Sequence, residues 1–159
     1  FGNRSGRVLF GLMFATALLS AFMSNTATTA MLITVIAPII ATLPPGDRFR
    51  TALALSIPTA ANLGGMATPI GTPPNALALG ALAGAGHSVS FSSWMLLATP
   101  LVILSLAIGW WLLMKLFPPS SPTLPLKLDG AFDRSRPAVL LYIVGGVTIL
   151  LWLTEALHG

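Results

Sequence analysis

Residues 18–33 read LLSAFMSNTATTAMLI, and this stretch decides how the rest of the chain is interpreted. The apolar residues on both sides are typical of a membrane helix, yet five of the six residues from Ser24 to Thr29 carry uncharged hydrogen-bonding side chains. Backbone that leaves the helix at membrane depth is tolerated only where protein or a water-filled cavity surrounds it. A polar, neutral break inside an apolar segment therefore predicts a buried turn with a binding role.

The composition indicates an all-α integral membrane protein. Of the 159 residues, 55% are hydrophobic and only 8% are charged, whereas soluble domains carry about 25% charged residues. The net charge of +4 rests on eight basic residues. They are spread over short polar loops, which favours topology signals over a nucleic-acid face, so we expect no nucleic-acid partner. The sequence contains no cysteine, which excludes disulfides and thiolate metal sites.

The lengths of the apolar runs predict two kinds of membrane segment. Residues 94–117 and 138–157 each reach the roughly 20 residues that a spanning helix needs. The two runs within 8–43 are shorter, about 16–17 residues each, and predict a re-entrant helical hairpin whose tip lies near mid-membrane. Two full spans joined at the break are the alternative. The polar, proline-rich residues 118–137 predict a cytoplasmic loop.

Residues 51–85 predict one transmembrane helix that is broken in the middle. The stretch 64–75 reads GGMATPIGTPPN, and its glycines and prolines do not continue a helix. Thr72 and Pro73 suit a helix start, as N-cap and first helical residue. Pro58 is expected to weaken the first half. The segment is thus read as two half-helices with an unwound link.

The basic residues predict the direction of these segments. If 8–43 returns to its side of origin and 51–85 crosses once, all eight lie on one side, which the positive-inside rule makes cytoplasmic. We therefore expect a multi-pass protein of the cytoplasmic (inner) membrane, surrounded by lipid. The basic residues are Arg4, Arg7, Arg48, Arg50, Lys115, Lys127, Arg134 and Arg136.

Two neutral breaks at similar depth predict a shared cavity, because broken helices at the midplane bind ions and substrate in many secondary transporters. At each break one helix ends in carbonyls and the next begins with free amides, which suit a cation and an anion respectively. Ser20 and Ser24 lie one turn apart on one helix face. With the Asn25 amide oxygen and carbonyls near Gly71, they predict an uncharged oxygen cage that suits Na⁺.

The same breaks offer groups to an anion. Thr26 and Thr72, at two helix N-termini, are expected to donate hydrogen bonds to a carboxylate or sulfate. Asn75 is either a substrate ligand or a helix-start residue that satisfies its neighbours, and the same alternatives hold for Asn62. No Lys or Arg lies in either break, so a bound polyanion would lack a fixed countercharge. Co-bound cations would lower that cost, which predicts coupling to sodium.

The two breaks together carry a family resemblance. SNTATTAML at 24–32, followed by GGMATPIGTPPNALALG at 64–80, resembles the divalent anion/sodium symporter family, whose members carry dicarboxylates, citrate or sulfate. In that family the Ser-Asn-Thr tip occurs in each of two inverted repeats. Here it occurs once, and the GTPPN form implies that residues 1–159 are the N-terminal repeat, one half of an inverted-repeat transporter. The resemblance also implies a homodimer with an elevator-like motion.

The resemblance further implies roles for single residues. Asn25 and Thr26 match residues that touch the substrate carboxylate, with Thr72 close by. The implied ligands of the first sodium ion are the side chains of Ser20, Ser24 and Asn25 and the backbone of Gly71.

Several functions are compatible with these features. The favoured one is sodium-coupled secondary transport of small divalent anions: dicarboxylate, citrate or sulfate. The alternatives are a sodium-independent anion exchanger of the same architecture and an anion channel, because selectivity filters also use unwound backbone. We expect no enzyme: G-x-S-x-G and H-E-x-x-H are absent from the sequence, and a serine nucleophile would lack a base.

Overall fold

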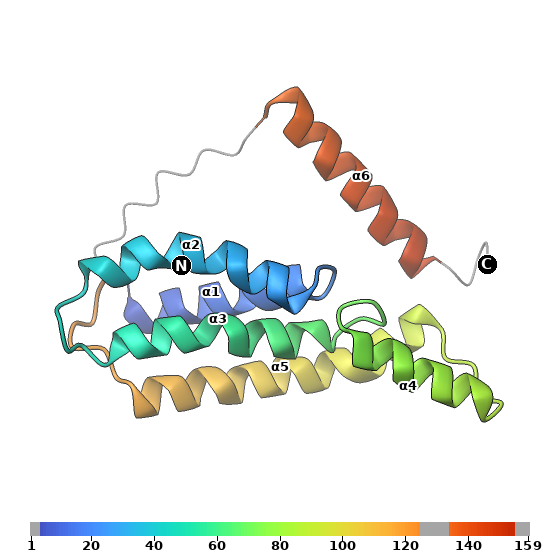
Figure 1. Ribbon diagram of the computed structural model, residues 1–159, viewed down its shortest axis with the longest axis horizontal. Helices are drawn as coiled ribbons and strands as arrows, with labels where there is room; N and C mark the ends of the chain where they lie inside the picture. Colours follow the sequence, from blue (N-terminus) through green and yellow to red (C-terminus); the bar gives the residue numbers. More distant parts are fainter. Residues whose placement is uncertain (1–3, 125–133, 155–159) are drawn as a thin grey trace.

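The computed structural model describes residues 4–124 and 134–154, and in this part of the chain the regular structure is entirely helical (Figure 1). The all-α expectation is therefore confirmed. Arg4 and Thr123 form an isolated antiparallel bridge. The helices are α1 (Ser5–Ser20), α2 (Asn25–Thr42), α3 (Phe49–Gly65), α4 (Pro73–Gly84), α5 (Phe91–Leu116) and α6 (Arg136–Leu153).

Helices α1, α2, α3 and α5 lie side by side, and α3 packs against the other three (Figure 1). Small residues make the close packing of α1 and α3 possible, as is common between membrane helices. Ala60 and Ala61 are fully buried, and a Cβ on Gly64 would overlap the backbone of Ala17. The two backbones therefore come into direct contact where α3 approaches the end of α1.

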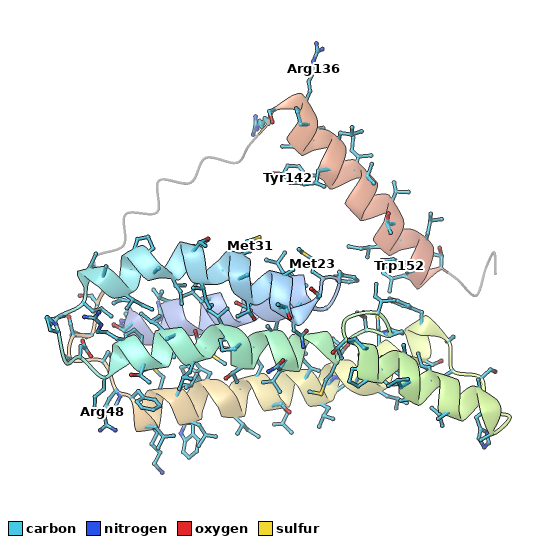
Figure 2. The ribbon with its side chains drawn as sticks, viewed as in Figure 1. Met23, Met31, Arg48, Arg136, Tyr142 and Trp152 are labelled. Atoms are coloured by element: carbon cyan, nitrogen blue, oxygen red, sulfur yellow. The ribbon has the colours of Figure 1, made fainter. Side chains whose placement is uncertain are left out.

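The basic residues gather at one end of this bundle. The start of α1 is joined to the segment after α5, because Ser5 Oγ donates to Ser121 O at 2.8 Å. At the same end Arg50 Nη1 donates to Leu43 O at 3.3 Å, and the Arg48 guanidinium lies 5.7 Å from the centre of the Phe117 ring. Figure 2 shows Arg48 at this end of the bundle and Met23 toward the other. Arg136 begins α6, away from this end (Figure 2), and Lys127 lies outside the described residues, so the one-sided distribution of all eight basic residues stays a prediction.

Three helices in the described residues are long and apolar enough to cross a membrane: α2, α5 and α6. Because α2 has 18 residues, length does not distinguish a re-entrant arm from a full span, and the re-entrant hairpin over 8–43 stays a prediction. Helix α5 begins at Phe91, before the apolar run at 94–117, because Ser90 caps it by accepting a hydrogen bond from Ser93 N at 3.2 Å.

The predicted loop 118–137 and span 138–157 fall partly outside the described residues, as does Lys127. Within the described part, α6 begins at Arg136 and has no buried residue. It stands apart from the bundle and approaches it at its C-terminal end (Figures 1 and 2). There Trp152 stacks on Phe22 and Phe91, with ring centres 6.3 and 5.8 Å apart.

Candidate ion and substrate site

The first break is a tight turn between α1 and α2. Helix α1 ends at Ser20 and α2 begins at Asn25, so the chain reverses within residues 21–24. Ser24 is the N-cap of α2, and its hydroxyl oxygen accepts a hydrogen bond from Ala27 N at 3.2 Å. The sequence predicted the break at Ser24–Thr26, but it lies slightly earlier, since Asn25 and Thr26 already belong to α2. Ser24 caps α2 and therefore does not share a face of α1 with Ser20, as was expected.

The second break is the loop of residues 66–72 between α3 and α4. Helix α3 remains helical on both sides of Pro58 and ends only at Gly65. Thr72 has the extended backbone of an N-cap and Pro73 is the first residue of α4, as predicted, although the Thr72 hydroxyl makes no capping bond. Pro73 and Pro74 have no amide hydrogen and Asn75 N donates to Thr72 O at 3.1 Å, so the start of α4 offers an anion its positive helix end but no free amide in these first positions.

The two breaks meet through backbone carbonyls. The Thr68 hydroxyl donates a hydrogen bond to Ala21 O, which ties the loop to the turn. A Cβ on Gly71 would lie 2.5 Å from Gly65 O and 3.0 Å from Ala21 O. Because only a residue without a side chain fits there, Gly71 lets the loop close over these two carbonyl oxygens.

Asn75 holds the loop in this shape from within. It is buried, and its Nδ2 donates to Gly65 O at 2.8 Å and to Thr68 O at 2.7 Å. Both amide hydrogens are thus engaged, and the remaining side-chain atom is an acceptor, which does not suit an anion. The geometry favours the second reading of Asn75, a helix-start residue that satisfies its neighbours.

Side-chain oxygens from α1 and α2 lie against the same corner. Ser20 is fully buried, and its Oγ donates to Asn25 Oδ1 at 2.8 Å. Asn25 Nδ2 in turn donates to Asn62 Oδ1 of α3 at 3.0 Å. A Cβ on Gly65 would overlap Asn25 Oδ1, so the amide oxygen sits directly on the end of α3.

Ser20, Asn25 and Gly71 are thus drawn together around Ala21 and Gly65. The other predicted residues lie around this corner. Ser24 and Thr26 are exposed next to Asn25, and Thr72 is half-buried directly after Gly71. The polar corner has no charged member, and the described residues contain no group of three or more His, Cys, Asp and Glu side chains that could hold a metal.

Thr68 and the carbonyls of Ala21 and Gly65 were not predicted as site groups from the sequence. Carbonyls carry no sequence signal of their own. For Thr68 the signal is its place as a hydroxyl inside a Gly- and Pro-rich break, which makes it available to bond to something other than its own helix.

An apolar cavity of about 440 Å³ lies beside the polar corner where the two breaks meet, between α1, α3 and α5. Thr68 and Ala21 border it, but most of its wall is formed by hydrophobic residues such as Phe14, Phe22 and Met95. Its wall offers almost no polar surface to sodium or to a carboxylate, so the polar corner is the candidate site.

Comparison with known proteins gives a match over the whole chain. Residues 1–159 match the family model described as citrate transporter. The sodium-dependent dicarboxylate transporter SdcS of Staphylococcus saprophyticus is 33% identical over 97% of this chain, which covers 33% of that protein. The SdcS protein of Staphylococcus aureus is 30% identical with the same coverage.

A relative from an animal agrees with these. The sodium-dependent high-affinity dicarboxylate transporter 3 of Caenorhabditis elegans is 36% identical over 76% of this chain and 25% of its own length. The chain spans about a third of the length of the bacterial relatives. With three apolar helices of spanning length and relatives that are transporters, the chain is part of a multi-pass membrane protein.

Proposed function

The chain belongs to the citrate transporter family, and from this premise we propose that it is part of a sodium-coupled secondary transporter for small dicarboxylate or citrate anions. The proposal concerns the full-length protein, in which these residues act as the N-terminal of two inverted repeats. The relatives that carry this segment are named sodium-dependent dicarboxylate transporters. Sulfate is a third substrate class that the same neutral donors would accept.

One observation carries the proposal: two helix breaks, far apart in the sequence, are bonded to each other at a corner lined by neutral oxygens. Thr68 joins Ala21 across the breaks, and Ser20 joins Asn25 beside them. Such a corner offers hard oxygen ligands without a fixed negative charge, which suits an ion that must also leave.

In the proposed sodium site, the ligands are the side chains of Ser20, Ser24 and Asn25 and the backbone around Gly71. The hydroxyl hydrogen of Ser20 now points to Asn25 Oδ1, so it must rotate away when both oxygens face a cation. The hydroxyl of Ser24 uses one lone pair for capping and keeps the other. Gly65 O and Ala21 O, which face Gly71, add carbonyl oxygens to the set.

In the proposed substrate site, Asn25, Thr26 and Thr72 receive one carboxylate of the anion. Thr26 lies in the first turn of α2 and Thr72 occupies the N-cap position of α4, so two positive helix ends support the hydroxyl donors. Asn75 takes part as the brace of the loop, and its substrate contact is indirect. Bound sodium supplies the positive charge that neither break contains, and this links the affinity for anion to the affinity for cation.

The remaining parts of the proposal concern the assembly. The basic end of the bundle, with Arg48 and Arg50, is placed in the cytoplasm and the protein in the inner membrane. The hairpin over 8–43 is re-entrant, and the full-length protein is a homodimer in lipid that moves a transport domain in an elevator-like motion. The grouping of basic residues at one end supports the direction.

The test is uptake of radiolabelled succinate, citrate and sulfate by the full-length protein in proteoliposomes, with an inward sodium gradient or with choline in its place. The proposal predicts saturable uptake of succinate or citrate that stops in choline. Uptake that continues unchanged in choline and depends on an anion inside the vesicle would instead establish the exchanger. Conductance in planar bilayers without saturable exchange would establish the channel.

A further inference from the structure

The side-chain amide of Asn25 is held at both ends. Its oxygen accepts from Ser20 Oγ at 2.8 Å, and its nitrogen donates to Asn62 Oδ1 at 3.0 Å. Asn62 lies in the last turn of α3, one turn before Gly65. The three side chains thus form a chain of hydrogen bonds that crosses from α1 through α2 to α3.

A side-chain amide fits the same space in two orientations that exchange its oxygen and its nitrogen, and the neighbours of these two atoms decide between them. Here the α-carbon of Gly65 approaches Asn25 Oδ1 so closely that a Cβ would overlap it. A close contact between the α-carbon of Gly65 and an oxygen is favourable. An amide NH₂ group in place of that oxygen would point its hydrogens at a carbon that accepts no hydrogen bond. The reversed amide would also turn the Asn25 oxygen toward the Asn62 oxygen and lose that bond.

We propose that Asn62 is a positioning residue for the sodium site, because its side-chain oxygen holds the Asn25 amide with its own oxygen on the side of Ser20, where the cation binds. This inference rests on the proposed function. Without Asn62, the amide loses one of the two contacts that fix its orientation and keeps only the one with Gly65. The reversed orientation, which presents the NH₂ group to the cation and repels it, then becomes more populated. Asn62 itself touches neither ion nor substrate in this account.

The size of the effect follows from a single hydrogen bond. The net free-energy contribution of one such bond, about 0.5–1.5 kcal/mol, corresponds to a factor of about 2–12 in the sodium affinity. Substrate affinity at saturating sodium should change little, because the cation itself then orders the Asn25 oxygen. The expected signature is a shift in sodium dependence with an unchanged maximal rate.

The experiment compares Asn62→Leu with the matched control Thr59→Val, in full-length protein reconstituted in proteoliposomes. Thr59 lies one turn earlier on α3, and its methyl group faces Gly109 of α5. For Asn62→Leu the sodium concentration for half-maximal succinate uptake should rise about 2–12-fold, with the maximal rate and the succinate KM at saturating sodium as in wild type. Thr59→Val should leave all three unchanged.

A binding measurement separates positioning from a fault in folding. Sodium should raise the Tm of the purified full-length protein, and for Asn62→Leu the same rise should need more sodium while the Tm in choline stays near wild type. In an Asn25→Leu background, adding Asn62→Leu should cause no further change in this sodium response, because Asn62 acts through Asn25.

Two results overturn the inference and leave the proposed function standing. One is an Asn62→Leu protein with the wild-type sodium dependence. The other is a variant whose succinate KM rises at saturating sodium, which would make Asn62 a substrate contact. If the uptake and the Tm of the wild-type protein are the same in sodium and in choline, the proposed function itself is overturned, and this inference with it.

Discussion

The turn between α1 and α2 and the loop between α3 and α4 meet at one corner, but they are stabilised in different ways. The turn is held from outside: Asn25 is bonded to Ser20 and Asn62, which belong to two other helices. The loop is held largely from inside, because Asn75 donates to Gly65 O and Thr68 O. Two bonds to other elements add to this: Thr68 donates to Ala21 O, and Trp94 Nε1 of α5 donates to Met66 O at 3.1 Å.

This difference indicates that the two breaks contribute different kinds of oxygen ligand. The turn offers side-chain oxygens, whose position depends on neighbours, and the loop offers backbone carbonyls, whose position depends on glycine and on one amide. Substitutions in the turn should therefore change the affinity for the ion. Substitutions in the loop should instead change the stability of the corner where the turn and the loop meet.

The largest effect is expected where the two breaks touch. Gly71→Ala would place a methyl group 2.5 Å from Gly65 O and 3.0 Å from Ala21 O, and the loop would have to move off the turn. At a cost of about 1–3 kcal/mol, sodium-driven succinate uptake by the full-length protein should fall about 5- to 150-fold.

Gly80→Ala is the matched control, because a Cβ at Gly80 of α4 meets nothing within 4 Å. It should preserve uptake and add about 0.5–1 kcal/mol of helix stability. Equal uptake by Gly71→Ala and Gly80→Ala would contradict the contact between the breaks.

The second-largest effect is expected at Asn75, which holds the loop in its shape. Asn75→Leu removes two hydrogen bonds and leaves Gly65 O and Thr68 O short of donors, which should lower the free energy of unfolding by about 1–3 kcal/mol. The measurement is the Tm of the detergent-purified full-length protein in choline, so that no sodium contributes. A Tm equal to wild type, together with a raised succinate KM, would identify Asn75 as a substrate ligand instead.

A smaller effect is expected in the turn. Ser20→Ala removes one hydroxyl that bonds to Asn25, and the sodium concentration for half-maximal uptake should rise roughly tenfold at most. Ser56→Ala is its control, because Ser56 is equally buried but donates only to Leu53 O within its own helix. If both variants keep the wild-type sodium response, Ser20 is no ligand.

The smallest effect is expected at Thr28, one turn after Asn25 on α2. Among the described residues its hydroxyl is the buried side-chain group without a hydrogen-bond partner. Thr28→Val should therefore raise the free energy of unfolding by up to about 1 kcal/mol, with unchanged sodium dependence. A weaker sodium response in this variant would instead add Thr28 to the cation ligands.

Much of this arrangement was accessible from the sequence. The neutral residues Ser24 to Thr26 and the Gly- and Pro-rich stretch 64–75 marked both breaks, because each interrupts an apolar run in a way that lipid does not tolerate. The Thr72–Pro73 pair marked the start of α4 because proline has no amide hydrogen to satisfy.

Other features were not accessible, for physical reasons. The bond from Thr68 to Ala21 depends on how two distant segments dock, and local pattern carries no information about docking. The bond from Asn75 to Gly65 depends on the path of the loop between them, which the glycines and prolines of that stretch do not specify. Helix boundaries shifted by a few residues, as at Phe91, because a capping serine extends the helix into polar sequence. The length of α2 left the choice between a re-entrant arm and a full span open.

The central claim is that the two breaks form one sodium site, and the most direct measurement is a pair of experimental structures of the full-length protein, in sodium and in choline. The account predicts a density peak in sodium, absent in choline, that is enclosed by the oxygens of Ser20, Asn25 and the backbone near Gly71. A sodium-dependent peak elsewhere, with this corner unchanged between the two conditions, would contradict it.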